Sequence, residues 1–150
     1  MDVFPYNKFE IGRLSVIEDF SCVNNGVGDV IIGERSRVGL GNTIIGPVKI
    51  GDKVLIAQNV TFSGMNHNYQ DVSLAIADQG FTTKEIIVDD DCWIGANSVV
   101  TAGVCIGKHS VVAAASVVTK DVPPYTIVAG NPAIPIKKYN QELETWERIK

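Results

Sequence analysis

Histidine is the residue of this chain best suited to proton transfer near neutral pH, and the sequence contains only two, His67 and His109. An imidazole has an unperturbed pKa of about 6.5, so it can take a proton from a hydroxyl group and return it later. His67 lies in the polar run Asn66-His67-Asn68-Tyr69, whereas His109 lies in a regular stretch after Lys108. We expect His67 to be the candidate general base and His109 to be an exposed corner residue. The residues alone also fit an exposed loop histidine at position 67.

The composition excludes several other kinds of site. Two histidines cannot supply the three imidazoles of a γ-class carbonic anhydrase zinc site within one copy of the chain. The three cysteines form no CxxC pair, which argues against a disulfide framework or a thiolate metal cluster. A formal net charge of −4 argues against binding to nucleic acid or to anionic membranes. No apolar run is long enough to span a bilayer, and the N-terminus lacks a signal-peptide pattern, so we expect a cytoplasmic protein.

A repeat of six residues runs through most of the chain and must position these groups. Large apolar residues occur at every sixth position in two runs that differ in phase. A small residue often follows directly, as at Gly33, Gly51 and Gly95, and we expect it to permit a sharp turn. A small or β-branched residue often stands four places after the apolar one. The large apolar positions are Ile32, Val38, Ile44, Ile50, Ile56, Phe62, Val88, Ile94, Val100, Ile106, Val112 and Val118.

A unit of six residues predicts one short strand plus one tight turn, which is neither a helical period nor a simple alternation. Stacked coils of such units would bury the aliphatic column and pair the backbones of neighbouring coils. Between Phe62 and Val88 the register breaks, because these positions are 26 residues apart. We therefore predict an excursion loop at about residues 63–87. This loop carries His67, as functional loops of this length often carry site residues.

The pattern [Ile/Val]-Gly-x-x-[Ser/Val]-x resembles the hexapeptide-repeat acyltransferases. The resemblance covers residues 11–139 and implies an all-β fold, a left-handed parallel β-helix, as a single domain over residues 1–139. Three further segments carry it: the run from Thr61 to His67, the run from Val117 to Pro124, and Ala129-Gly130-Asn131-Pro132. They are similar to sugar, polysaccharide-biosynthesis and xenobiotic O-acetyltransferases. Residues 140–150 have a helix-friendly composition, and we expect a short helical tail there.

The resemblance also implies a function and a set of site residues. It implies acetyl transfer from acetyl-CoA, without a metal, to a sugar or another small hydroxyl acceptor in surface polysaccharide biosynthesis. It also implies a homotrimer with sites between subunits. His67 would be the general base, and the backbone N–H of Ala96 would stabilise the oxyanion. Donor-binding positions would be Trp93, Ala96, Ala114, Thr119, Lys120 and Lys137. Acceptor contacts would come from Asn42, Asn59, Asn66 and Tyr69.

Two departures from the family pattern bear on these expectations. Ala115 stands where many members have glycine, and its methyl group would narrow the donor groove. The stretch Ile44-Ile45-Gly46-Pro47 lacks the acceptor-binding carboxylate of the galactoside and maltose branch. Two alternatives stay open: N-acetylation of an amino sugar, and a non-catalytic β-helix scaffold.

Overall fold

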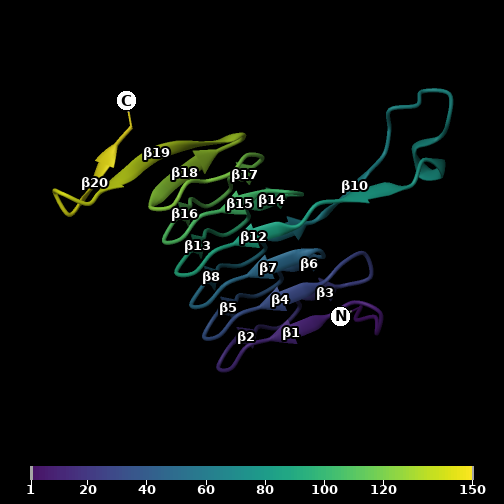
Figure 1. The fold of residues 1–150 in the computed structure, drawn as a ribbon, viewed down its shortest axis with the longest axis horizontal. Coiled ribbons are helices and arrows are strands. Elements are labelled where there is room, and N and C mark those ends of the chain that lie inside the picture. The colour runs from purple at the N-terminus through teal and green to yellow at the C-terminus, as the bar shows by residue number, and fades with distance from the viewer. Residues whose placement is uncertain (1, 150) are drawn as a thin grey trace.

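Each coil of the chain consists of three short strands joined by tight corners, and successive coils stack directly on one another (Figure 1). The computed structural model describes residues 2–149. Neighbouring strands of successive coils pair in parallel, so the coils form three flat sheets around one core. The fold is a left-handed parallel β-helix, and this prediction is confirmed.

The three sheets are named here A, B and C. Sheet A consists of β3 (Cys22–Asn24), β6 (Thr43–Ile45), β9 (Thr61–Ser63), β14 (Val99–Thr101) and β17 (Val117–Val118). Sheet B consists of β1 (Phe9–Ile11), β4 (Val30–Ile32), β7 (Val48–Ile50), β12 (Ile86–Val88) and β15 (Cys105–Ile106). Sheet C consists of β2 (Val16–Ile17), β5 (Arg37–Val38), β8 (Leu55–Ile56), β13 (Trp93–Ile94), β16 (Val111–Val112), β18 (Thr126–Gly130), β19 (Ala133–Asn140) and β20 (Thr145–Arg148).

The core is the column of aliphatic residues that the repeat predicts. All twelve predicted positions are buried, with exposed fractions of 3% or less. They stack in register, as in the row Ile32, Ile50, Val88 and Ile106 across sheet B. Burying one such side chain contributes about 1.5–3 kcal/mol, so the regular stack is the main source of stability.

The small residue that often follows the aliphatic one does not make the sharp turn that the sequence analysis predicts for it. Positive φ values occur two residues later, for example at Lys53 (φ 54°) and Asp91 (φ 59°). The small residue is required because the next coil passes very close. A Cβ atom on Gly33 would lie 2.6 Å from the backbone carbonyl carbon of Gly51. The glycines of the repeat therefore permit stacking rather than bending.

A long arm interrupts the stack between β9 and β12, and projects away from the coils (Figure 1). It contains the antiparallel pair β10 (Met65–His67) and β11 (Phe81–Thr83), and the single 3₁₀ turn η1 (Ile76–Asp78). Gln79 holds the distal loop by side-chain hydrogen bonds to the backbone of Asp71. At the root, Gly64 is buried, and a Cβ there would lie 2.6 Å from the carbonyl oxygen of Pro47.

The predicted helical tail is wrong, because residues 140–149 continue sheet C as a β-hairpin. Strand β19 pairs antiparallel with β18, and β20 pairs antiparallel with β19. The Asn140 side-chain oxygen accepts hydrogen bonds from the backbone N–H groups of Glu142 and Leu143, which closes the turn. Trp146 packs edge-on against Tyr139 with 5.4 Å between ring centroids. The open edge of β18 offers backbone hydrogen-bond partners that a short isolated helix lacks, so this segment forms strands instead of a helix.

Among residues 2–149 no helix has the length and apolarity needed to cross a membrane.

Candidate functional site

The three sheets form the sides of a prism around the core, and each edge of this prism is the place where the chain passes from one sheet to the next. The chain passes from sheet A to sheet B at edge AB, which carries the arm and Lys120. It passes from sheet C to sheet A at edge CA, which carries Gln58, Ala96 and Ala114. It passes from sheet B to sheet C at edge BC, which carries His109. Every predicted site residue can be placed on one of these edges or on sheet C.

His67 is the last residue of β10, at the root of the arm on edge AB. It is exposed and pairs with Phe81 across the two-stranded ribbon. Its neighbours Asn66 and Tyr69 are also exposed on the arm. Within residues 2–149, no side chain forms a hydrogen bond with the imidazole, while Asn68 bonds the carbonyl oxygen of Gln79 and so fixes the backbone beside it. The imidazole is therefore held by the ribbon backbone and open to a ligand.

An apolar groove of about 550 Å³ runs over sheet C and edge CA. Three of the predicted donor-binding residues, Trp93, Ala96 and Ala114, line it together. Val111 and Ile127 form its floor beside the half-exposed Trp93 ring. Because the groove wall at edge CA is mostly alanine and glycine, with Gln58 as its one long side chain, an extended, slender ligand can approach the backbone closely there.

The other predicted donor residues lie outside this groove. Thr119 and Lys120 are exposed where the chain leaves sheet A, at edge AB. Lys137 lies on β19, directly opposite Ile127 of the groove floor. The expectation that the Ala115 methyl group narrows the groove requires Ala115 to line it, but Ala115 is not among the lining residues. Ala115 instead occupies a corner with a φ of 59°.

The predicted acceptor residues divide in the same way. Asn59 is exposed at edge CA, and Asn66 and Tyr69 are exposed on the arm. Asn42 is fully buried, and its side-chain amide donates to the carbonyl oxygens of Gly39 and Ala57 and accepts from the N–H of Val60. All of its polar atoms are used, because the bonds to Ala57 and Val60 join two coils and the bond to Gly39 closes the corner of its own coil. The prediction that Asn42 contacts the acceptor is therefore wrong.

The predicted residues thus form two groups that one chain does not bring together. The group on edge AB consists of Asn66, His67, Tyr69, Thr119 and Lys120. The group on edge CA and sheet C consists of Asn59, Trp93, Ala96, Ala114 and Lys137. A side of the prism of about five residues separates the two edges by roughly 15 Å.

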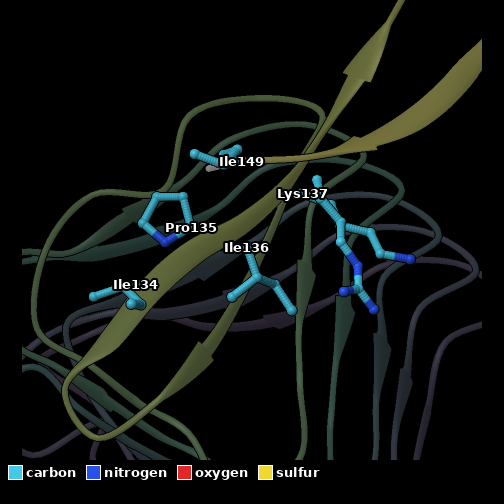
Figure 2. Close-up of a pocket in the computed structure, with 6 residues that line it drawn as sticks. Ile134, Pro135, Ile136, Lys137 and Ile149 are labelled. Atoms are coloured by element: carbon cyan, nitrogen blue, oxygen red, sulfur yellow. The ribbon is translucent and has the colours of Figure 1, made fainter.

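A second pocket, of about 460 Å³, lies on the C-terminal hairpin (Figure 2). Its apolar wall consists of Ile134, Pro135 and Ile136 on β19, with Ile149 beyond β20. Its polar residues are Lys137 and Arg148, which are directly opposite each other in the β19–β20 pair. The pocket lining contains no carboxylate.

Sequence reasoning missed Gln58, Val111 and Ile127 of the groove, and Arg148. The groove residues Trp93 and Val111 each stand directly before an inward aliphatic position, Ile94 and Val112. The residue before each inward aliphatic position points outward and stacks on its counterpart in the next coil. The repeat could therefore have predicted which side chains line the outer face of sheet C. Arg148 had no such signal, because the hairpin lies beyond the repeat.

No group of three or more His, Cys, Asp or Glu side chains in the part of the chain that the structure describes is arranged to hold a metal ion. The three cysteines are unpaired, and only Cys92 is buried. Burial raises the pKa of the Cys92 thiol to about 11, so it stays protonated at neutral pH. His109 is exposed on edge BC beside Tyr125, as the sequence predicts.

Comparison with known proteins gives a consistent result. The model of the family described as "Hexapeptide repeat of succinyl-transferase" matches residues 29–62 and 85–120, on either side of the arm. Galactoside O-acetyltransferase of Lactococcus lactis is 30% identical over 145 residues, covering 94% of this chain and 69% of the relative. Galactoside O-acetyltransferase of Escherichia coli is 42% identical over 94 residues, covering 62% of this chain and 45% of the relative. The chain thus spans about half the length of several curated relatives.

Among solved structures, a hexapeptide-repeat acetyltransferase of Vibrio cholerae complexed with acetyl coenzyme A has a TM-score of 0.69 and 32% identity to this chain. The match covers 88% of this chain and 72% of that one.

Proposed function

Because this chain belongs to the hexapeptide-repeat acetyltransferase family, we propose that it transfers an acetyl group from acetyl-CoA to a hydroxyl group of a small acceptor. The observation that carries the proposal is the apolar groove, which collects Trp93 and Ala96 from one coil and Ala114 from the next. Ligand sites are typically concave and apolar with few polar groups, as this groove is.

The groove fits the extended arm of acetyl-CoA. Its wall of small residues leaves backbone groups accessible, so the amides of a pantetheine arm can pair with them. The Trp93 ring, 55% exposed, offers a broad apolar surface for the same arm. Ala96 lies on edge CA and lines the groove, and its backbone N–H takes the role of oxyanion donor in this proposal.

The complete site forms between two copies of the chain, in a homotrimer. His67 on edge AB of one copy would meet the groove on edge CA of the next. The five strands of sheet A, which joins these two edges, contain no Asp, Glu, Lys or Arg. Depletion of charged residues is typical of the buried centre of an interface, so sheet A is the face that the copies share.

The chemical step is direct transfer. His67 takes the proton of the acceptor hydroxyl as its oxygen attacks the thioester carbonyl carbon, and the Ala96 N–H stabilises the oxyanion that forms. The carbon–sulfur bond then breaks, and the protonated His67 returns its proton to the leaving thiolate. The products are the acetyl ester and the free CoA thiol. General base action contributes about 10²–10⁴-fold and one oxyanion donor about 10²–10³-fold.

The acceptor in this proposal is a sugar of surface polysaccharide biosynthesis. The polar and aromatic side chains beside His67, Asn66 and Tyr69, are of the kinds that contact sugar hydroxyls and ring faces. The galactoside relatives support a sugar. The chain lacks a carboxylate at Ile44-Ile45-Gly46-Pro47, which favours an acceptor other than galactosides or maltose.

The test is acceptor-dependent release of CoA, measured with a thiol reagent, for wild type and His67→Ala. The acceptor panel contains nucleotide sugars, simple glycosides, amino sugars, serine and streptogramin. We expect turnover with one sugar class, lost by at least about 100-fold in His67→Ala, with unchanged binding of acetyl-CoA. His109→Ala, which changes the histidine on edge BC, should keep full activity. Full activity of His67→Ala would exclude this base, and a wild-type protein that binds no acetyl-CoA would favour a non-catalytic scaffold.

A further inference from the structure

The two ends of the coil stack differ in how the chain covers its core. At the C-terminal end, the last inward side chains, Val118 and Val128, are at most 2% exposed, so the chain closes the core there by itself. At the N-terminal end, Phe9 and Ile17 are only partly buried, and Ile11, an inward position of the repeat, is 44% exposed. Within residues 2–149, no strand pairs with the outer edges of β1 and β2 (purple in Figure 1). A stack of repeats with an open end needs a cap or a partner there.

Large apolar side chains also occupy all three corners of this end. Leu14 on edge BC is 72% exposed, and Phe20 on edge CA is 89% exposed. Both residues have a left-handed φ, of 62° and 61°, which disfavours bulky side chains. On edge AB, the ring of Tyr6 stacks on that of Phe4 with 5.5 Å between centroids. The corresponding corners of the next two coils carry polar residues or glycine: Arg35 and Lys53 on edge BC, and Gly41 and Asn59 on edge CA.

The end of a second copy fits these features when a two-fold axis turns it over. The axis passes through edge BC and the middle of sheet A, at right angles to the stack. It places β1 antiparallel over β2 of the second copy, so that the free strand edges can pair. In the register that brings Phe9 over Ile17 of the second copy, both open cores are closed. The same register brings Tyr6 over Phe20 of the second copy, so the exposed aromatic rings cover each other.

The charges along the two end strands match in this register as well. Lys8 faces Glu18 of the second copy, and the axis repeats this pair on its other side. Opposite charges directly across an antiparallel pair are stabilising. Among residues 2–24, the one pair of like charges is that of the two Arg13 side chains on the axis. Each Arg13 lies 3.9 Å from a carboxylate oxygen of Glu34 in its own chain, which offsets this repulsion.

The proposed trimer makes the contact large enough to be stable. With sides of roughly 15–20 Å, two prism ends would bury on the order of 500 Å² together, less than the about 1,200 Å² of a stable interface. Two trimers would join three pairs of ends at once and bury about 1,500 Å², which is the standard size. The two-fold axis crosses sheet A, the face that copies share in the proposed trimer, so all three joins are compatible with one three-fold axis.

We infer that two trimers of this chain join through their N-terminal ends, and that Leu14 and Phe20 hold the resulting hexamer together. The copy number rests on the trimer of the proposed function, whereas the self-complementary end does not depend on it. The occupant of the open end is a second copy, because its shape, apolar corners and charges match those of the end itself. His67 and Ala96 lie in later coils, so the join leaves the groove and the arm accessible.

The experiment measures the mass of the assembly by light scattering and native mass spectrometry over a range of protein concentrations. We expect six copies for wild type, or about 97 kDa as six times the chain mass of 16.2 kDa. Leu14→Asp places a carboxylate beside the axis, where it meets its counterpart, although aspartate tolerates a left-handed φ better than leucine. We expect trimers that join at least about 100-fold more weakly, with an unchanged circular dichroism spectrum and unchanged binding of acetyl-CoA.

Two further variants make the test specific to this end. Lys53→Asp is the matched control, because Lys53 occupies the same corner of edge BC two coils further into the stack, with a φ of 54°. It should stay hexameric. Phe20→Ser removes the aromatic contact without adding a charge, and it should also give trimers.

The possible masses separate this inference from the proposed function. A wild type that stays trimeric at the highest concentration would overturn the inference and leave the proposed function standing. A Lys53→Asp protein that dissociates as fully as Leu14→Asp would also overturn it. A wild-type dimer, about 32 kDa as twice 16.2 kDa, that is lost in Leu14→Asp would support the joined ends and contradict the trimer. Single chains of Phe20→Ser would place Phe20 in the contact within the trimer and overturn its role in the join.

Discussion

His67 and Ala96 lie at opposite ends of sheet A. The arm that carries His67 follows the end of β9, and Ala96 precedes the start of β14, which pairs in parallel with β9. All strands of this sheet run in the same direction, so their starts gather on edge CA and their ends on edge AB. A proton acceptor on one edge and an oxyanion donor on the other cannot serve one substrate within a single chain. In the proposed trimer, each active site uses one edge from each of two copies.

A mixing experiment tests this arrangement. His67→Ala removes the base, and Ala114→Trp fills the groove at an exposed position, so each variant alone should be nearly inactive. Trimers assembled from equal amounts of both should recover about a quarter of wild-type turnover, because one junction in four pairs an intact His67 with an intact groove. Turnover is measured as CoA release after co-refolding, and mass spectrometry of the intact trimers confirms that copies exchanged. If copies exchange but turnover does not recover, His67 and the groove of the same chain act together, and the arrangement between copies is wrong.

The repeat predicted the fold well because each six-residue unit reports directly on burial. Every predicted aliphatic position is in the core, and even the break at the arm is visible as a lost register. The C-terminal hairpin was not predictable in this way. Residues such as Leu143 and Glu144 favour a helix locally, and only the open edge of β18 makes them a turn between strands. The division of the site between two edges could not be predicted either, because it depends on the corner of the coil at which each residue lies and not on residue type.

Asn42 should matter for stability rather than for acceptor binding. Asn42→Ala removes two hydrogen bonds between coils and one within its own corner, and it leaves the buried N–H of Val60 without its acceptor. We expect the free energy of unfolding to fall by roughly 2–3 kcal/mol, measured by chemical denaturation. Asn66→Ala, an exposed change on the arm, should cost less than about 0.5 kcal/mol. A higher acceptor KM in Asn42→Ala, at unchanged stability, would contradict this role.

Cys92 should make the protein less stable in alkali. Its pKa is raised to about 11 in the folded protein by burial, whereas the thiol of an unfolded chain ionises near pH 8.5. The unfolded state therefore loses its proton first as the pH rises, and stability falls between about pH 8.5 and 11, by about 3 kcal/mol. Cys92→Val should not show this part of the loss, since Val54 fills the same position in the preceding coil. Equal alkaline loss in both proteins, measured by denaturant unfolding at several pH values, would exclude the thiol as its cause.

Ala115→Gly should stabilise the protein without changing donor binding. Ala115 has a φ of 59°, a left-handed conformation that costs alanine about 1–2 kcal/mol. Glycine adopts it without that cost but loses more entropy on folding, so we expect a net gain of about 0.5–1 kcal/mol, seen as a higher Tm. Ala113→Gly, two residues earlier and without a positive φ, should instead lower the Tm. Because Ala115 does not line the groove, the Kd for acetyl-CoA should be the same in wild type and Ala115→Gly. Tighter binding of acetyl-CoA by Ala115→Gly would mean that the Ala115 methyl group does narrow the path of the donor. The groove would then extend around edge CA as far as Ala115.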